Sequence, residues 1–300
     1  MTTATTQQRL RARISAPLCL LGFLAVYLIA VRTPFGQRAE NSLFGAGEVG
    51  AKPAWIYDWS GAAYGSSALP PLEHTAMPTL LVGMAAIAIV TLVRRCWWQG
   101  VAAIAVVVAT MGGKEVARMI LTRPDLVGAR ESLIESSFPS GHVAIPAALA
   151  LGAVLVASPR VRPYVTVAGM LWIAVIAAAV LATYHHRSSD VLGSTLLACA
   201  CYCLAVRLLP SAHAPAHAPG DATVDTPGDA PADTPADAPG VTRHSRTLPA
   251  VALAVSAVGA LLAGARDDSL TQSLVFATAG FLCAALFWFT TTQRPARTGR

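Results

Sequence analysis

The sequence predicts an all-α, polytopic membrane helix bundle, in which a core of six spans is followed by two C-terminal spans. Of the 300 residues, 54% are hydrophobic and only 13% are charged, whereas soluble domains carry about 25% charge. The apolar residues gather into runs of about 20 residues, the length at which a helix crosses a bilayer. Basic residues concentrate in the short segments between the runs, as membrane topology requires.

Eight apolar runs are the expected spans. They lie at residues 14–31, 75–93, 98–121, 143–158, 164–184, 191–209, 248–265 and 274–291. The first follows Arg9, Arg11 and Arg13, but no small-x-small cleavage site comes after it, so we interpret it as a retained anchor. More than half of the 22 lysines and arginines fall on the side that holds both termini. We therefore expect both termini in the cytoplasm and the protein in the plasma membrane.

A polar insert at residues 210–246 divides the chain into a six-span core, residues 1–209, and a two-span hairpin with a basic tail, residues 247–300. Asp or His recurs every four residues in the insert, but its prolines rule out a regular helix, so a disordered cytoplasmic linker is predicted. The net charge of +6 comes from scattered topological residues, so no nucleic-acid partner is expected. The six cysteines lie in or beside apolar runs, which predicts buried hydrophobes and no metal site.

The first polar cluster is Phe138-Pro139-Ser140-Gly141-His142, immediately before the fourth span. Pro and Gly favour a tight turn, and Gly lets the backbone approach a ligand closely. The turn leads into a helix N-terminus, whose free N–H groups favour anions. The Ser140 hydroxyl and the titratable His142 ring lie beside it. An ordinary turn at the start of a helix fits these residues equally well.

The second cluster lies between the fifth and sixth spans. His186 and Asp190 are four residues apart, so they share a face of the first helical turn. A carboxylate bonded to one ring nitrogen orients the ring and makes the other nitrogen a better nucleophile. His185 pairs by the same spacing only with Ser189, so His186 is the candidate nucleophile. A helix-capping Asp190 in an interfacial loop is the alternative.

The third cluster lies at the outer end of the third span, where Lys114 and Arg118 are one turn apart and Arg123 precedes Pro124. Charges in an apolar span are costly and usually functional, and three cations at one level suit a phosphate group. Snorkelling to the interface is the alternative, and it accounts for Lys114 least well. All three clusters fall at one level on the outer side. Together they predict phosphoryl transfer by covalent catalysis without a metal.

These clusters resemble the type 2 phosphatidic acid phosphatase family, the lipid phosphate phosphatases, whose signature is Lys-x6-Arg-Pro, Pro-Ser-Gly-His and Ser-Arg-x5-His-x3-Asp. The second block is intact at residues 139–142, and the third ends with His186 and Asp190. The first block keeps Arg123-Pro124, but its lysine position is Val116, which leaves the role to Lys114 or Arg118. The arginine of the third block falls on Val180, and Arg187 is the candidate to replace its charge.

By this resemblance His186 attacks phosphorus and forms a phosphohistidine, Asp190 orients it, and His142 protonates the leaving alkoxide and then activates water. The resemblance implies that the phosphate oxygens are held by Arg123, Lys114, Arg118, Ser140, Gly141 and Arg187. The implied substrates are lipid phosphates, as monoesters or diphosphates, which arrive from the outer leaflet. No cofactor is implied.

Two other functions are open to this sequence. The missing arginine favours a catalytically inactive family member that binds or moves lipid phosphates, although the intact second block and the spacing of His186 and Asp190 argue for an enzyme. A transporter predicts charges or broken helices near mid-membrane, whereas the charges here cluster at one face. A vanadium haloperoxidase shares these motifs by family resemblance, but such enzymes are soluble and the apolar spans argue against one.

Overall fold

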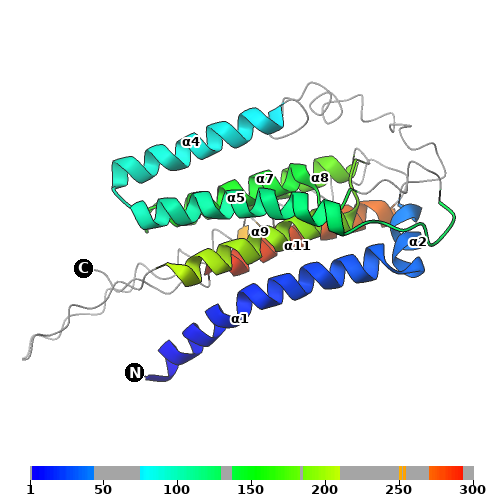
Figure 1. The fold of residues 1–300 in the computed structure, drawn as a ribbon, viewed down its shortest axis with the longest axis horizontal. Helices are drawn as coiled ribbons and strands as arrows, with labels where there is room; N and C mark the ends of the chain where they lie inside the picture. The colour runs from blue at the N-terminus through cyan, green and yellow to red at the C-terminus, as the bar shows by residue number, and fades with distance from the viewer. Residues whose placement is uncertain are drawn as a thin grey trace, which may run out of the picture.

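The computed structural model describes residues 2–43, 75–129, 137–182, 185–209, 250–251, 253–254 and 270–292. Within these ranges the regular secondary structure is helical (Figure 1), as predicted. The principal elements are α1 (Thr2–Val26), a π-helical turn η1 (Tyr27–Val31), α2 (Pro34–Ser42), α4 (Ala76–Arg94), α5 (Trp97–Ile120), α7 (Gly141–Val156), α8 (Arg162–Ala182), α9 (Ser188–Leu208) and α11 (Leu270–Thr292).

Six of the described helical segments are long and apolar enough to cross a membrane. They are Ile14–Val31, Ala76–Arg94, Trp97–Ile120, Arg162–Leu181, Ser188–Leu208 and Leu274–Thr292. The chain thus has the helices of an integral membrane protein, and the all-α class is confirmed. The fourth expected span corresponds to α7, which is shorter than these six. The insert at 210–246 and nearly all of the seventh expected span lie outside the described residues, so the domain boundaries stay predictions.

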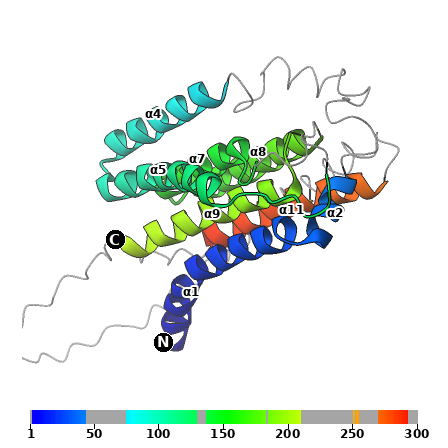
Figure 2. The ribbon, with the colours of Figure 1, turned by 45° about the vertical axis from the view of Figure 1, so that its right-hand side comes forward.

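Helix α7 lies at the centre of the bundle. It packs against α5, α8 and α9, and all but three of its sixteen residues are buried. Five of its sixteen residues are alanine and two are glycine, and small side chains let membrane helices approach closely. A Cβ at Gly152 would lie 3.4 Å from the Ala103 carbonyl oxygen of α5. Figure 2 shows α4 at one edge of this bundle and α1 at the opposite edge.

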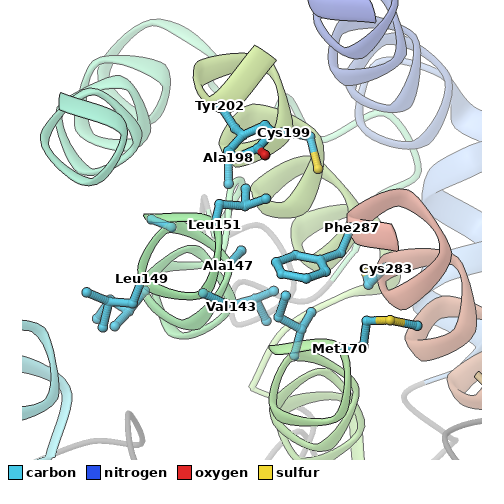
Figure 3. Packing of buried hydrophobic residues seen from close by; sticks show 14 of the residues in the cluster. Val143, Ala147, Leu149, Leu151, Met170, Ala198, Cys199, Tyr202, Cys283 and Phe287 are labelled. Atoms are coloured by element: carbon cyan, nitrogen blue, oxygen red, sulfur yellow. The ribbon is translucent and has the colours of Figure 1, made fainter. Parts of the chain in front are cut away.

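The C-terminal helix α11 is packed into the bundle, against α8 and α9. Figure 3 shows the Phe287 ring of α11 directed towards residues of α7 and α8, and this ring is fully buried. A Cβ at Gly169 of α8 would lie only 2.8 Å from the ring, so the absence of a side chain at that position makes room for it. The last predicted span is therefore a structural part of the core.

The end of α5 and the starts of α7 and α9 meet at one end of the bundle, where α2 also lies (Figure 1). Aromatic residues fix α1 and η1 to this end: the Phe138 ring lies 5.1 Å from that of Phe23 and 5.5 Å from that of Tyr27. A Cβ at Gly193 would lie 2.5 Å from the Phe138 ring. Gly193 thus lets the turn before α7 lie flat against α9.

Candidate active site

Two histidines that are far apart in the sequence meet at this end of the bundle. His142 is in the first turn of α7 and His186 lies just before α9, and the His142 Nδ1 and His186 Nε2 atoms are 3.1 Å apart. The rings are edge-on, with centroids separated by 5.3 Å. His186 is buried, whereas its neighbour His185 is exposed. The structure thus brings together the candidate nucleophile and the candidate acid.

Asp190 lies on the other side of the His186 ring. Its Oδ2 atom is 3.5 Å from His186 Nδ1, within ion-pair range but long for a hydrogen bond. The same oxygen accepts hydrogen bonds from the backbone N–H of Arg187 at 3.0 Å and from Ser137 Oγ at 2.5 Å. Asp190 is fully buried. It therefore both caps the start of α9 and faces the ring, so the two interpretations of this residue are compatible.

The turn at Ser140 and Gly141 is tied to the start of α9. The Ser140 N–H donates to the Asp190 carbonyl oxygen at 3.1 Å, and Ser194 Oγ lies 2.7 Å from the Ser140 carbonyl oxygen. Ser140 is the N-cap residue of α7, but its side chain makes no capping hydrogen bond. Its buried Oγ has no hydrogen-bond partner among the described residues. An unpaired buried hydroxyl costs about 1–3 kcal/mol, so this group is better explained as a ligand contact than as a helix cap.

Lys114 and Arg118 of α5 approach this turn. A Cβ at Gly141 would lie 3.4 Å from Lys114 Nζ, so the ammonium group rests directly on the glycine. The Lys114 side chain is only 12% exposed and forms an ion pair with Glu115. The charges of both Lys114 and Arg118 act on the His142 ring. Both candidates for the first-block lysine thus lie near the histidines, and Lys114 is the one in contact with the turn.

Arg123 is buried and paired with a residue that the sequence analysis did not single out. Its Nη1 atom lies 3.4 Å from Oε2 of Glu40 in α2. The other carboxylate oxygen of Glu40 accepts a hydrogen bond of 3.0 Å from the backbone N–H of Ser189. Burial and the nearby Asp190 carboxylate raise the pKa of Glu40, and the Ser189 and Arg123 donors oppose this. No motif in the sequence marks Glu40; its only signal is an acidic residue in a short polar segment next to an apolar span.

Arg187 and Val180 occupy different surroundings. Arg187 is buried, and its Nη1 atom lies 3.4 Å from Ser137 Oγ. Burial and the positive charge of Arg123 lower the pKa of Arg187, while Asp190 and Glu40 oppose this. Val180 belongs to the apolar core, and its carbonyl oxygen accepts the backbone N–H of His185 and that of His186, at 3.1 and 3.3 Å. Position 180 thus holds a buried apolar side chain, whereas the buried Arg187 guanidinium lies beside Ser137.

A small pocket adjoins His186 on the side of α2. The residues that line it come from α2, the end of α8, the start of α9 and α11: Glu40, Leu43, Leu181, His186, Arg187, Ser188 and Phe276. Its wall therefore combines charged groups with apolar side chains.

Comparison with known families identifies the domain that holds this site. The family model of the PAP2 superfamily matches residues 101–213, a stretch that contains every site residue predicted from the sequence. Comparisons with curated proteins and with solved structures gave no match. The resemblance found in the sequence motifs is therefore confirmed: this chain carries a PAP2 superfamily domain at residues 101–213.

Proposed function

We propose that the protein is an integral membrane phosphatase that hydrolyses lipid phosphates, as monoesters or diphosphates, through a phosphohistidine at His186. The observation that carries this proposal is the 3.1 Å approach of His142 Nδ1 to His186 Nε2, with Asp190 behind His186. With the His186 proton on Nδ1, facing Asp190, the Nε2 lone pair is free to act as the nucleophile. The two nitrogens can share a hydrogen bond in which His142, as an imidazolium, donates from Nδ1 to His186 Nε2. The imidazolium is also the form of His142 that can protonate the leaving oxygen in the first step.

The reaction runs in two steps. His186 Nε2 forms a bond to phosphorus while the bond from phosphorus to the leaving oxygen breaks, and His142 gives its proton to that oxygen. Water then attacks the phosphohistidine, His142 takes the proton from the water, and inorganic phosphate leaves. A phosphoryl group bound between the rings requires them to move apart, because 3.1 Å is a direct hydrogen-bond distance.

The phosphate oxygens are held by the surrounding donors. Lys114 takes the role of the first-block lysine, because its ammonium group lies on Gly141, and Arg118 adds a second charge one turn later. The Ser140 hydroxyl and the Gly141 N–H complete the cradle at the start of α7. Arg123 and Arg187 bind from the opposite side. Arg187 supplies the charge that the family places at position 180.

The site faces the outer side of the plasma membrane, with both termini in the cytoplasm. Arginines at the other end of the bundle support this orientation: Arg94 donates to the Val156 carbonyl oxygen and Arg162 to that of Ala157. Those two groups lie at the C-terminal end of α7, the opposite end from His142. Basic residues are retained on the cytoplasmic side.

The test is release of inorganic phosphate by the purified protein in detergent, with a chelator present, from phosphatidic acid, phosphatidylglycerol phosphate and a polyprenyl diphosphate. We compare wild type, His186→Ala and His185→Ala; the last removes the exposed histidine next to the nucleophile and serves as the matched control. We expect release from wild type and His185→Ala and none from His186→Ala. If wild type releases no phosphate from any of these lipids, the result supports the inactive lipid-binding alternative. The presence of the buried Val180 at the position of the family arginine favours that alternative.

A further inference from the structure

Helix α2 lies outside residues 101–213, yet two of its side chains reach the site. Gln37 and Glu40 are 2% and 7% exposed, and they are three positions apart, so they lie on one face of the helix. A buried carboxylate is costly unless it is paired. The partners of these two residues therefore indicate why polar groups are buried at this position.

Gln37 attaches α2 to the loop that carries Arg123. Its Nε2 atom donates to the carbonyl oxygens of Val31 and Pro124, at 2.8 and 2.6 Å, and its Oε1 atom accepts the N–H of Leu126 at 3.2 Å. From the preceding turn, the Tyr27 hydroxyl donates to the Thr122 carbonyl oxygen at 2.8 Å. The loop on both sides of Arg123 is thus hydrogen-bonded to the N-terminal segment.

Glu40 joins this loop to the start of α9. One carboxylate oxygen contacts Arg123 Nη1 at 3.4 Å, and the other accepts the Ser189 N–H at 3.0 Å. The Arg123 Nη2 atom is buried and has no hydrogen-bond partner within the described part of the chain. A guanidinium held along one edge by a carboxylate keeps its remaining N–H groups in a fixed direction.

We propose that Glu40 is a positioning residue for Arg123. The Glu40 carboxylate holds the Nη1 atom of Arg123, so that the Nη2 atom of Arg123 remains available to a phosphate oxygen. The inference rests on the proposed function, because it assigns a role to the phosphate-binding side of that site. Glu40 also offsets the mutual repulsion of Arg123 and Arg187, which act on each other electrostatically.

A second role for the carboxylate is competition, in which Glu40 occupies the place of the substrate phosphate and leaves when substrate binds. The bonds of Gln37 argue against it, because they fasten α2 to backbone groups of the loop that carries Arg123. The two roles predict opposite effects of removing the charge. A positioning carboxylate strengthens phosphate binding, whereas a competing one weakens it.

The test is a double-mutant cycle with Glu40→Gln, Arg123→Ala and the double variant. Affinity for inorganic phosphate is measured by calorimetry. The kinetic constants kcat and KM are measured with the lipid phosphate that wild type hydrolyses best. We expect Glu40→Gln to weaken phosphate binding and to lower kcat by about tenfold or more, as for loss of a charge-assisted contact. In the Arg123→Ala background the same change should have less than about a twofold effect, because contacting residues are not additive.

Asp125→Asn is the matched control. It removes an acidic charge from the same loop, but Asp125 is exposed and its carboxylate accepts hydrogen bonds from loop N–H groups, including those of Val127 and Ala129. We expect its phosphate affinity and kcat to stay within about twofold of wild type, as for an exposed charge. If Glu40→Gln does not fold, Glu40→Asp replaces it, because it keeps the charge on a shorter side chain. A lowered kcat with unchanged thermal unfolding then supports positioning, and an unchanged kcat overturns it.

Three results overturn the proposal. Tighter phosphate binding by Glu40→Gln means that the carboxylate competes with phosphate. Equal effects of Glu40→Gln with and without Arg123 mean that Glu40 acts elsewhere. An unchanged affinity and kcat mean that it has no role at the site. The phosphate titration needs no turnover, so a wild type that binds phosphate but hydrolyses no lipid contradicts the proposed function and leaves this cycle interpretable.

Discussion

Replacing Asp190 with Asn tests whether its negative charge supports the nucleophile. The substitution keeps the size of the side chain, and its one oxygen can still accept the Arg187 N–H that caps α9. The Asp190 Oδ2 atom lies 3.5 Å from His186 Nδ1. At an effective dielectric constant of about 20, a full charge at that distance stabilises a positive ring by about 5 kcal/mol. We therefore expect kcat to fall on the order of 10³-fold when attack on phosphorus makes the ring positive.

The assay is single-turnover phosphate release, with formation of acid-labile phosphohistidine followed in the same reactions. Ser137→Ala is the control, because it removes a hydrogen bond to the same Asp190 oxygen and leaves the charge in place. We expect that variant to lose about 10- to 100-fold in kcat, as for one hydrogen bond to a charged group, and so less than Asp190→Asn. If Asp190→Asn loses less than Ser137→Ala, with both equally stable to heat, the carboxylate is a helix cap and the electrostatic reasoning is refuted.

Further measurements address the phosphate cradle and its surroundings. Ser140→Ala should lower kcat by about 10- to 100-fold with no loss of melting temperature, because its hydroxyl bonds to none of the described residues; a clear drop in melting temperature contradicts this. Lys114→Ala should reduce kcat/KM more than Arg118→Ala, because Lys114 Nζ lies on Gly141; the reverse order assigns the first-block role to Arg118. For Glu40, burial raises the pKa, so the folded protein binds this proton more readily than the unfolded chain. Stability should then fall as pH rises from the ordinary value of 4.5 through the raised one. The melting temperature of wild type should therefore decline relative to that of Glu40→Gln over that range. A difference between the two melting temperatures that does not change with pH contradicts this prediction.

The helices were predictable because the length of an apolar run is a local property of the sequence. Even so, α7 begins at Gly141 rather than at the first strongly apolar residue, because the carbonyl oxygen of its N-cap residue Ser140 already accepts the Ala144 N–H. The packing of α11 could not be predicted. A helix that is apolar on all sides does not specify its neighbours, and the fit of Phe287 against Gly169 appears only once both helices are placed.

The pairing of His186 with Asp190 was predictable from their four-residue spacing, although His186 lies just before α9 and not in its first turn as predicted. The approach of His142 to His186 joins residues 44 positions apart, and only the three polar clusters at one membrane level indicated it. The sequence left Lys114 and Arg118 as alternatives, since both face the same way. The close contact that separates them depends on the depth of α5 relative to α7, and residue spacing does not determine it.

Glu40 lies beyond sequence reasoning for a related physical cause. Its partners Arg123 and Ser189 are 83 and 149 residues away, and a polar residue does not indicate which distant group it will meet. The charges of the residues around Glu40 explain what it does at the site. Arg123 and Arg187 are both buried and repel each other, while the Asp190 carboxylate is already engaged by the capping N–H and by Ser137. Two like charges buried together are unfavourable, and the segment before the matched domain places the Glu40 carboxyl group beside Arg123.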